Sequence, residues 1–227
     1  MTDVVRMTER EERLISTLVG ELAPVRPLAG PVRRATLWIG AVAAIGCAMS
    51  GSADLASVWA RLSGATDMWL SFVATCLTAV LAAIAAFQLS LPDRRVTWAL
   101  LPLPAFVLWL AASGMGCLRS WVIPGVEIIP ADHIKQCFFF IVGFSVPLSA
   151  LMILMMRKGY SLHPNTSAAL AGLAVAAAAA ALLTLVHPFE ATAVDLVVHF
   201  FSVGLVVIVN RFLGGALLQR AVVSHKG

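Results

Sequence analysis

The sequence predicts an all-α fold, a polytopic membrane bundle of about six transmembrane helices with the N- and C-termini in the cytoplasm. Three observations lead to this prediction. Of the residues, 60% are hydrophobic and 12% are charged, whereas roughly a quarter of the residues in soluble domains are charged. The apolar residues form long blocks between short polar breaks. The basic residues gather in alternate breaks, as they do in the cytoplasmic loops of membrane proteins.

Six blocks approach the roughly 20 apolar residues that cross a bilayer as a helix. Each must be helical, because the bilayer has no water to satisfy backbone groups. The first block is the weakest, since Gly51 and Asp54 interrupt it. We expect loops between the blocks, including one over Ser52–Asp67. The blocks are Ala35–Ser52, Met68–Leu91, Trp98–Leu118, Gln136–Met156, Ser167–Val186 and Val194–Leu213.

The distribution of Lys and Arg predicts the orientation. With the N-terminus inside, only Arg61, Arg119 and Lys135 fall on the outer side. The other 13 of the 16 basic residues fall inside: Arg6, Arg10, Arg13, Arg26, Arg33, Arg34, Arg94, Arg95, Arg157, Lys158, Arg211, Arg220 and Lys226. The predicted parts are a cytoplasmic N-terminal segment (1–34), a six-helix transmembrane domain (35–220) and a cytoplasmic tail (221–227). The net charge of +4 therefore reflects membrane topology, and no direct contact with nucleic acid is expected.

Two features inside the blocks bear on packing. Ala176–Ala181 is a run of small residues, which lets helix backbones approach closely in a bundle. Pro102, Pro104 and Pro147 interrupt the third and fourth blocks and predict kinks that neighbouring helices relieve. A transport site made from broken helices is the alternative interpretation of these prolines.

The N-terminal segment contains a second kind of helix. Residues 8–22 are predicted to form an amphipathic helix, in which Thr8 and Glu11 fit a capping box. Pro24 and Pro27 then end it. Its apolar stripe consists of Leu14, Ile15, Leu18, Val19 and Leu22.

Such a stripe must be buried against something. The membrane surface or the protein's own loops are one option, and a groove on a soluble partner is the other. Anionic lipid would repel the acidic residues of the segment, which are Asp3, Glu9, Glu11, Glu12 and Glu21. Both options remain open from the residues alone.

Polar residues gather at the outer ends of the predicted helices, and they are Cys117, Cys137, His187, Asp195 and His199. Thiol, imidazole and carboxylate groups in one layer could bind a transition-metal ion, and Cys117 and Cys137 could form a disulfide in an oxidising compartment. Asp195 and His199 share one helix face. Packed or interfacial residues are the plainer interpretation of this layer. The residues identify no certain cofactor, and a transition-metal ion could act here as a signal.

Catalysis has little support in the sequence. It contains no nucleophile elbow, phosphate-binding loop or paired acidic motif. We therefore expect a protein that is not an enzyme.

The order of several features carries a resemblance to a known family. The N-terminal helix runs into Leu22-Ala-Pro-Val-Arg26 and Pro31-Val-Arg-Arg34, Cys137 opens the fourth block, and Pro147 lies inside it. Then follow Arg157-Lys158, the Ala/Gly-rich fifth block after Pro164, His187-Pro188, Gly214-Gly215 and Arg220. From about Leu14 to Arg220 the chain resembles the NrsF-type anti-sigma factors of proteobacteria. These are six-helix inner-membrane proteins that hold an extracytoplasmic-function (ECF) sigma factor inactive at the membrane.

The resemblance implies that an ECF sigma factor contacts the N-terminal segment, here the stripe Leu14, Ile15, Leu18, Val19 and Leu22. It also implies a periplasmic sensor of metal or oxidative stress that uses two cysteines. Cys137 matches the first, whereas His187 stands at the place of the second. This difference argues against a switch made of two cysteines at these positions. A metal site of one cysteine and one histidine remains compatible with the sequence, since both residues bind transition metals. Cys117 could supply another thiol.

Two other functions fit the same residues. A small transporter or ion-coupled permease would use Asp195 and His199 as a proton relay. A membrane redox subunit would need haem ligands on facing helices, and no such set of histidines stands out.

Overall fold

The computed structural model describes the backbone of residues 2–20, 29–51, 53–64, 66–122, 131–159, 161–186 and 193–224. Side chains are described for residues 11–20, 29–51, 53–60, 62–64, 66–115, 135–159, 161–186 and 196–219. All the regular elements in these residues are helices, which confirms the all-α fold class. The predicted number of spans is also confirmed, because six helical stretches are long and apolar enough to cross a membrane. They are Pro31–Ser50, Thr66–Leu89, Val96–Met115, Lys135–Met156, Pro164–Leu183 and Leu196–Gln219.

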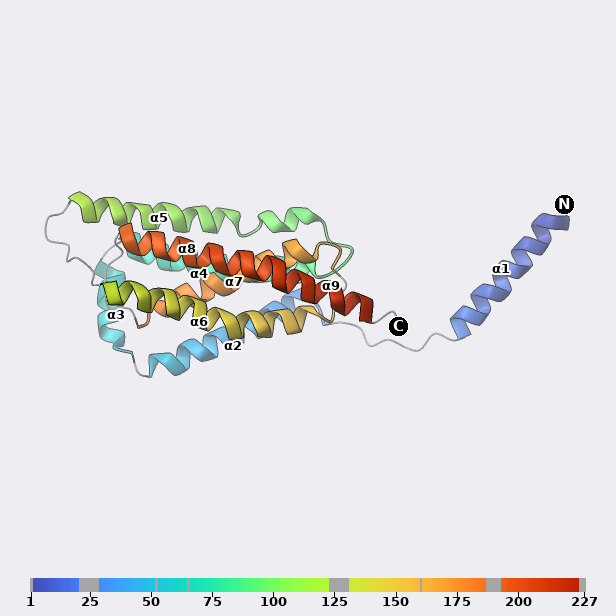
Figure 1. Ribbon diagram of the computed structural model, residues 1–227, viewed down its shortest axis with the longest axis horizontal. Helices are drawn as coiled ribbons and strands as arrows, with labels where there is room; N and C mark the ends of the chain where they lie inside the picture. Colours follow the sequence, from blue (N-terminus) through green and yellow to red (C-terminus); the bar gives the residue numbers. More distant parts are fainter. Residues whose placement is uncertain are drawn as a thin grey trace.

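The spanning helices run back and forth between two ends of one bundle (Figure 1). α2 (Pro31–Ser50) leaves what we term the terminal end, α3 (Leu55–Gly64) lies across the opposite end, and α4 (Thr66–Leu89) returns. The 3₁₀ helix η1 (Val96–Leu100) and α5 (Leu103–Val122) lead out again.

The second half of the bundle continues the same alternation. α6 (Ala131–Met156) returns to the terminal end and α7 (Pro164–Leu183) leaves it. α8 (Ala193–Val209) comes back, and a π-helical turn η2 (Asn210–Gly214) joins it to α9 (Gly215–Ser224). α2 therefore begins at the same end at which α9 finishes, so both ends of the bundle's chain lie on one side of a membrane.

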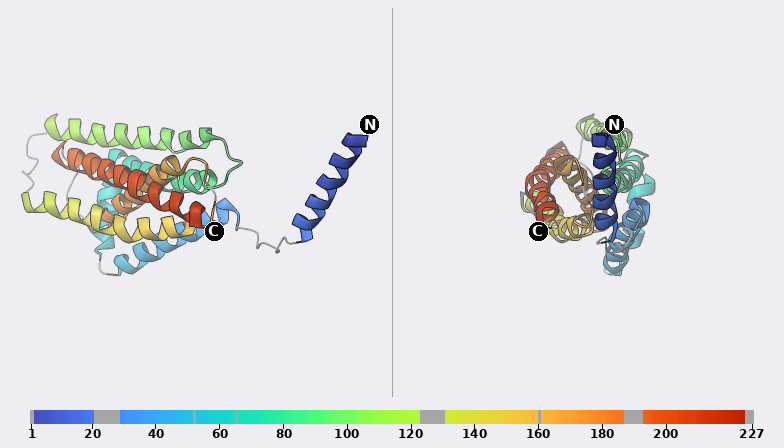
Figure 2. Two further views of the ribbon diagram at one scale, coloured as in Figure 1. Left: turned by 45° about the vertical axis from the view of Figure 1, so that its right-hand side comes forward. Right: turned by 90° about the vertical axis from the view of Figure 1, so that its right-hand side faces the viewer.

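α1 (Thr2–Gly20) stands beyond the terminal end and clear of the bundle (Figures 1 and 2). It begins earlier than the predicted range 8–22. The predicted capping box at Thr8 and Glu11 is therefore wrong, because Thr8 lies inside the helix rather than at its start. The proline-rich stretch that follows lies outside the described residues.

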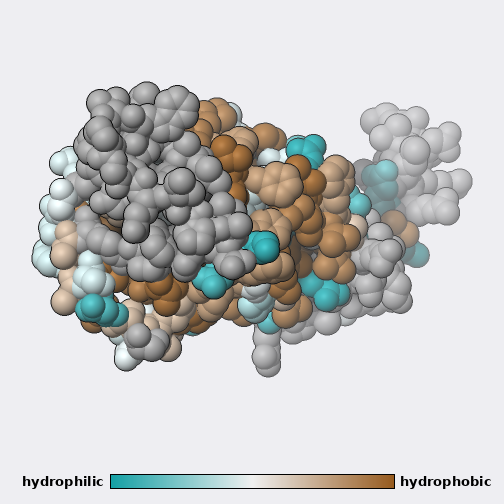
Figure 3. All heavy atoms as spheres, turned by 60° about the vertical axis from the view of Figure 1, so that its left-hand side comes forward, coloured by the Kyte–Doolittle hydropathy of each residue, from teal (hydrophilic) through white to brown (hydrophobic). Residues whose placement is uncertain are grey.

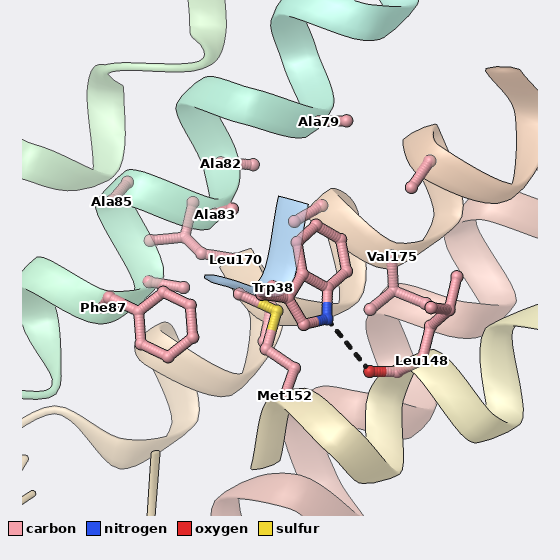
Figure 4. Packing of buried hydrophobic residues seen from close by; sticks show 14 of the residues in the cluster. Trp38, Ala79, Ala82, Ala83, Ala85, Phe87, Leu148, Met152, Leu170 and Val175 are labelled. Atoms are coloured by element: carbon pink, nitrogen blue, oxygen red, sulfur yellow. Dashed lines mark hydrogen bonds between the residues drawn. The ribbon is translucent and has the colours of Figure 1, made fainter. Parts of the chain in front are cut away.

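α7 is the most enclosed helix of the bundle, and α4, α6, α8 and η2 all pack against it. Its small residues allow this close approach, and Ala176, Ala177, Ala178, Ala179 and Ala180 are all buried. Figure 4 shows part of the core, in which Trp38 of α2 points between Val175 of α7 and Leu148 of α6. The indole Nε1–H of Trp38 donates a hydrogen bond to the carbonyl oxygen of Leu148 at 3.4 Å. The packing role predicted for the alanine run is thus confirmed.

The prolines act differently in the two spans that contain them. The third span breaks between η1 and α5, at Leu101 and Pro102. Proline disfavours the helical conformation of the residue before it and has no N–H to donate. The carbonyl of Pro102 nevertheless accepts a hydrogen bond from the amide of Phe106 at 2.9 Å. Pro147, by contrast, lies inside an unbroken α6.

The sides of the bundle are oily. Large apolar side chains such as Leu37, Val107, Phe139, Val146 and Phe200 are exposed, and brown spheres dominate the side of the bundle in Figure 3. A soluble protein of this size does not expose so much apolar surface. A bilayer is the medium that such a surface requires.

Candidate partner-binding and sensing sites

The N-terminal stripe is exposed along the described half of α1. Leu14, Ile15, Leu18 and Val19 are between 55% and 62% exposed, and every described side chain from Glu11 to Gly20 is exposed. Leu22, the fifth predicted member, lies outside the described residues. The described part of the chain therefore leaves the stripe open to a partner.

The apolar face of α1 differs from the opposite face in its polar groups. Glu11 precedes Leu14, Ile15 and Leu18 by three, four and seven positions, so it shares their face. On another face, the hydroxyls of Ser16 and Thr17 both donate to the carbonyl oxygen of Arg13 at 2.8 Å. The apolar face thus carries a carboxylate at one end, which disfavours an anionic lipid surface.

Four of the five predicted sensing residues belong to helices α5, α6 and α8, near the ends that lie at the opposite end of the bundle (Figure 1). Cys117 lies near the end of α5, Cys137 near the start of α6, and Asp195 near the start of α8. His199 follows Asp195 by one turn of α8 and is half-buried. The side chains of Cys117 and Asp195, and all of His187, lie outside the described residues.

Cys137 points into the bundle. Its side chain is 1% exposed and packs with Ile141 of its own helix and with Ala179 and Leu183 of α7. Phe140 and Phe144 stack beside this group, with ring centroids 4.4 Å apart. The thiol is therefore buried against apolar side chains of α6 and α7.

The described side chains contain no group of three His, Cys, Asp or Glu residues that could hold a metal ion. Three of the five predicted sensing residues are not among those side chains. The metal ligands Cys137 and His187 therefore stay a prediction.

The terminal end contains an interaction that the sequence analysis missed, and we call it the Arg34 joint. Arg34 of α2 is 5% exposed, although the neighbouring Arg33 is exposed. Its guanidinium donates to Ser90 Oγ at 3.2 Å and to the carbonyl oxygen of Met155, and it lies 4.9 Å from the ring centroid of Phe87. These contacts join the start of α2 to the ends of α4 and α6.

The ends of two helices explain how a buried cation is tolerated there. α4 ends at Leu89 and α6 ends at Met156, and the last carbonyls of a helix carry a partial negative charge. The face of Phe87 attracts the cation as well. The position of Arg34 one turn before Trp38, which faces the core, is the sequence signal that could have predicted its burial.

The connection from α6 to α7 closes over the same end of α4. The hydroxyls of Ser161 and Ser167 donate to the carbonyl oxygen of Leu89 at 2.8 and 3.0 Å. A Cβ on Gly159 would lie 2.6 Å from the carbonyl oxygen of Ser90, so only glycine fits there. The terminal end is consequently a packed platform from which the N-terminal segment extends.

The π-helical turn is a second tightly fitted region. The side-chain amide nitrogen Nδ2 of Asn210 donates to Ser149 Oγ of α6 at 3.0 Å and to the carbonyl oxygen of Val206 at 2.9 Å. A Cβ on Gly172 of α7 would lie 2.8 Å from Cβ of Asn210 and 2.9 Å from Cα of Val207. Glycine is thus required where α7 crosses the start of the turn.

Residues 18–219 match the model of a protein family described as NrsF, negative regulator of sigma F. The chain belongs to the NrsF family. No curated protein and no solved structure matches it. The family match covers all six candidate spans and the end of α1, including Leu18 and Val19, and begins after Leu14 and Ile15.

Membership gives this NrsF-family protein a regulatory role. It is a negative regulator of a sigma factor, and a sigma factor is its partner. With six candidate spans it is also a multi-pass membrane protein. Gly214, one of the pair that entered the family resemblance, lies in close contact with α6 and α7, since a Cβ there would lie 2.9 Å from Cδ1 of Ile153 and 3.3 Å from Cβ of Ala168.

Proposed function

We propose that this protein is an inner-membrane anti-sigma factor that holds an ECF sigma factor through the apolar stripe of α1. One observation carries the proposal: four aliphatic side chains of α1 are more than half exposed and nothing described in the chain covers them. A free aliphatic stripe on a helix is the usual ligand of a groove in a soluble partner. The family description supplies the kind of partner.

The orientation supports this role. α1 extends from the terminal end of the bundle, where the chain also carries the exposed pairs Arg94-Arg95 and Arg157-Lys158. Basic residues flank membrane spans on the cytoplasmic side. This distribution supports an orientation in which α1 lies in the compartment that contains the transcription machinery.

The size of the stripe suits a complex that must be reversible. Burying one Leu, Ile or Val side chain contributes about 1.5–3 kcal/mol, and association costs about 4–15 kcal/mol in lost freedom. Four side chains together contribute at most about 6–12 kcal/mol, which is comparable with that cost and leaves no large surplus. Further contacts with the platform around Arg94 and Arg157 would complete the grip.

Co-purification tests the contact. Full-length protein is extracted in detergent from cells that also express a tagged ECF sigma factor of the same organism. We expect Leu14→Asp with Leu18→Asp to abolish recovery of the sigma factor. Thr17→Asp is the matched control, because it adds a charge to α1 outside the stripe, and it should retain the complex. Equal recovery with both variants would place the contact elsewhere.

The release signal is the second part of the proposal. A transition-metal ion that binds Cys137 and His187 at the opposite end would shift helix packing and weaken the grip on the sigma factor. Thiolate and imidazole are ligands that such ions prefer. Because Cys137 is 1% exposed between α6 and α7, the ion would bind a state in which these helices have separated. A change from mostly held to mostly free needs about 5 kcal/mol of preference for that state.

A reporter of sigma-dependent transcription tests the signal. Cys137→Ser should abolish the response to added metal or oxidant. Cys47→Ser and Cys76→Ser are the controls, because these thiols lie on other spans and belong to no predicted sensing group. A normal response in the Cys137→Ser strain would remove this residue from sensing and leave the anti-sigma role in place.

A further inference from the structure

α3 is fixed at the level of the membrane surface by its connections. Ser50 ends one membrane span and Thr66 begins the next, so α3 has only a few residues on either side to leave the bilayer. Its start is firm, because Asp54 Oδ1 accepts hydrogen bonds from the amides of Ala56 and Ser57 at 3.2 and 3.3 Å. Figure 1 shows α3 running across the end of the bundle instead of along the spans.

The apolar arc of α3 has two edges. Val58 is buried and Leu62 half-buried, which places one edge against the bundle. Leu55 and Trp59, one turn apart on the adjacent edge, are 53% and 66% exposed. Ser57 lies on the far side of the helix. The exposed edge is therefore a large aliphatic–aromatic surface that the described chain leaves uncovered.

The neighbouring start of α4 repeats the pattern. Trp69 is 45% exposed and its ring lies 6.3 Å from that of Phe72, and Leu70 is partly exposed as well. Tryptophan concentrates at the boundary between headgroups and acyl chains, where its ring is apolar and its N–H stays hydrated. α3 also contains no acidic residue that anionic headgroups would repel.

We infer that the Leu55–Trp59 edge of α3 binds lipid, inserting into the headgroup boundary of the leaflet at the opposite end of the bundle. α3 is thus an interfacial helix that anchors the connection between α2 and α4 to the membrane surface. This inference stands apart from the proposed grip on a sigma factor, since it holds for either orientation of the bundle.

Tryptophan quenching tests it in the full-length protein reconstituted in phosphatidylcholine–phosphatidylglycerol nanodiscs. The emission of Trp59 is the difference between the wild-type protein and Trp59→Phe. We expect lipids brominated near the headgroup to remove most of this difference. Lipids brominated at mid-chain should remove less, and aqueous iodide should remove little.

Moving the indole provides the control. In the double variant Trp59→Phe with Ser57→Trp the indole sits on the opposite side of α3, and iodide should quench it while brominated lipid should not. Quenching of Trp59 itself by iodide alone would overturn the inference, because the edge would then face water. Protection from both quenchers would also overturn it, because a second copy or another protein would cover the edge.

Discussion

α1 and α3 are both amphipathic helices outside the membrane spans, yet they differ in charge, in tethering and in the residues they expose. α1 exposes aliphatic side chains beside Glu11 and Glu12, and residues 21–30 separate it from the bundle. α3 exposes Leu55 and Trp59, and short connections hold it against α4. The comparison shows that amphipathicity alone does not decide whether a helix binds lipid or another protein. In the roles that we propose, charge keeps α1 off anionic lipid and geometry keeps α3 in contact with lipid.

Removing α1 should have the largest effect on function and the smallest on the fold. We expect deletion of residues 2–20 to abolish sigma-factor binding and to leave the thermal unfolding midpoint of the detergent-solubilised bundle unchanged, because the described α1 side chains are all exposed. Replacing residues 55–64 by a Gly/Ser linker should do the reverse, lowering the midpoint and retaining binding. Binding of the sigma factor to the protein that lacks α1 would contradict the proposed role of α1 as the contact.

Replacing Arg34 tests how α1 is connected to the bundle. The Arg34 joint lies at the start of α2, to which residues 21–30 connect α1. Arg34→Met loses two hydrogen bonds from a charged donor and the contact with Phe87, and we expect a loss of about 2–3 kcal/mol in the free energy of unfolding. Arg33→Met is the control, because Arg33 is exposed. Thermal unfolding measures both variants.

The same Arg34 variant tests whether the Arg34 joint also positions the N-terminal segment for binding the sigma factor. Unchanged sigma-factor affinity in Arg34→Met would mean that α1 acts independently of the bundle. Weaker binding would mean that the joint also positions the N-terminal segment. A midpoint equal to that of Arg33→Met would contradict the structural role of the joint.

Gly172→Ala tests the packing on which the bundle depends. The added methyl would overlap Asn210 and Val207, and such overpacking costs about 1–2 kcal/mol. Gly143→Ala in α6 should be neutral, because no atom lies within 4 Å of the added carbon. Thermal unfolding of both variants in the same detergent provides the measurement. Equal unfolding midpoints for Gly172→Ala and Gly143→Ala would show that α7 and the π-helical turn pack less tightly than the short distances at Gly172 indicate.

The smallest effect is expected from charge on α1. In Glu11→Lys with Glu12→Lys, each new lysine gains about 1 kcal/mol near an anionic surface. We therefore expect α1 to associate with phosphatidylglycerol nanodiscs and to become more resistant to added trypsin than Glu11→Gln with Glu12→Gln. Equal digestion of the two variants would show that charge is not what keeps α1 off the membrane.

The spans could be predicted because their signal is local: length and apolarity decide whether a segment crosses a bilayer. α3 was missed, although Leu55, Val58, Trp59 and Leu62 recur at helical spacing, because ten residues are too few to span. The sequence signal for α3 was the helical spacing of its apolar residues and not the length of an apolar block.

The contacts of the site residues could not be predicted, because they depend on distant parts of the chain. The sequence places Cys137 at a helix end, but its burial depends on Ala179 and Leu183. Arg33 and Arg34 are equally basic, and only the approach of α4 and α6 decides which of them is enclosed. The π-helical turn likewise depends on Gly172 meeting Asn210.

The alanine-rich surface of α7 has a mechanical consequence. Side chains that end at Cβ form shallow ridges, so a helix packed on them interlocks less deeply than it would on leucine. α6 lies on this smooth cylinder, whereas the close approach at Gly172 fixes α7 against α8 and the π-helical turn. Small sliding displacements of α6 along the axis of α7 therefore meet little steric resistance, and shear of packed helices is one of the ways in which proteins carry motion between distant ends.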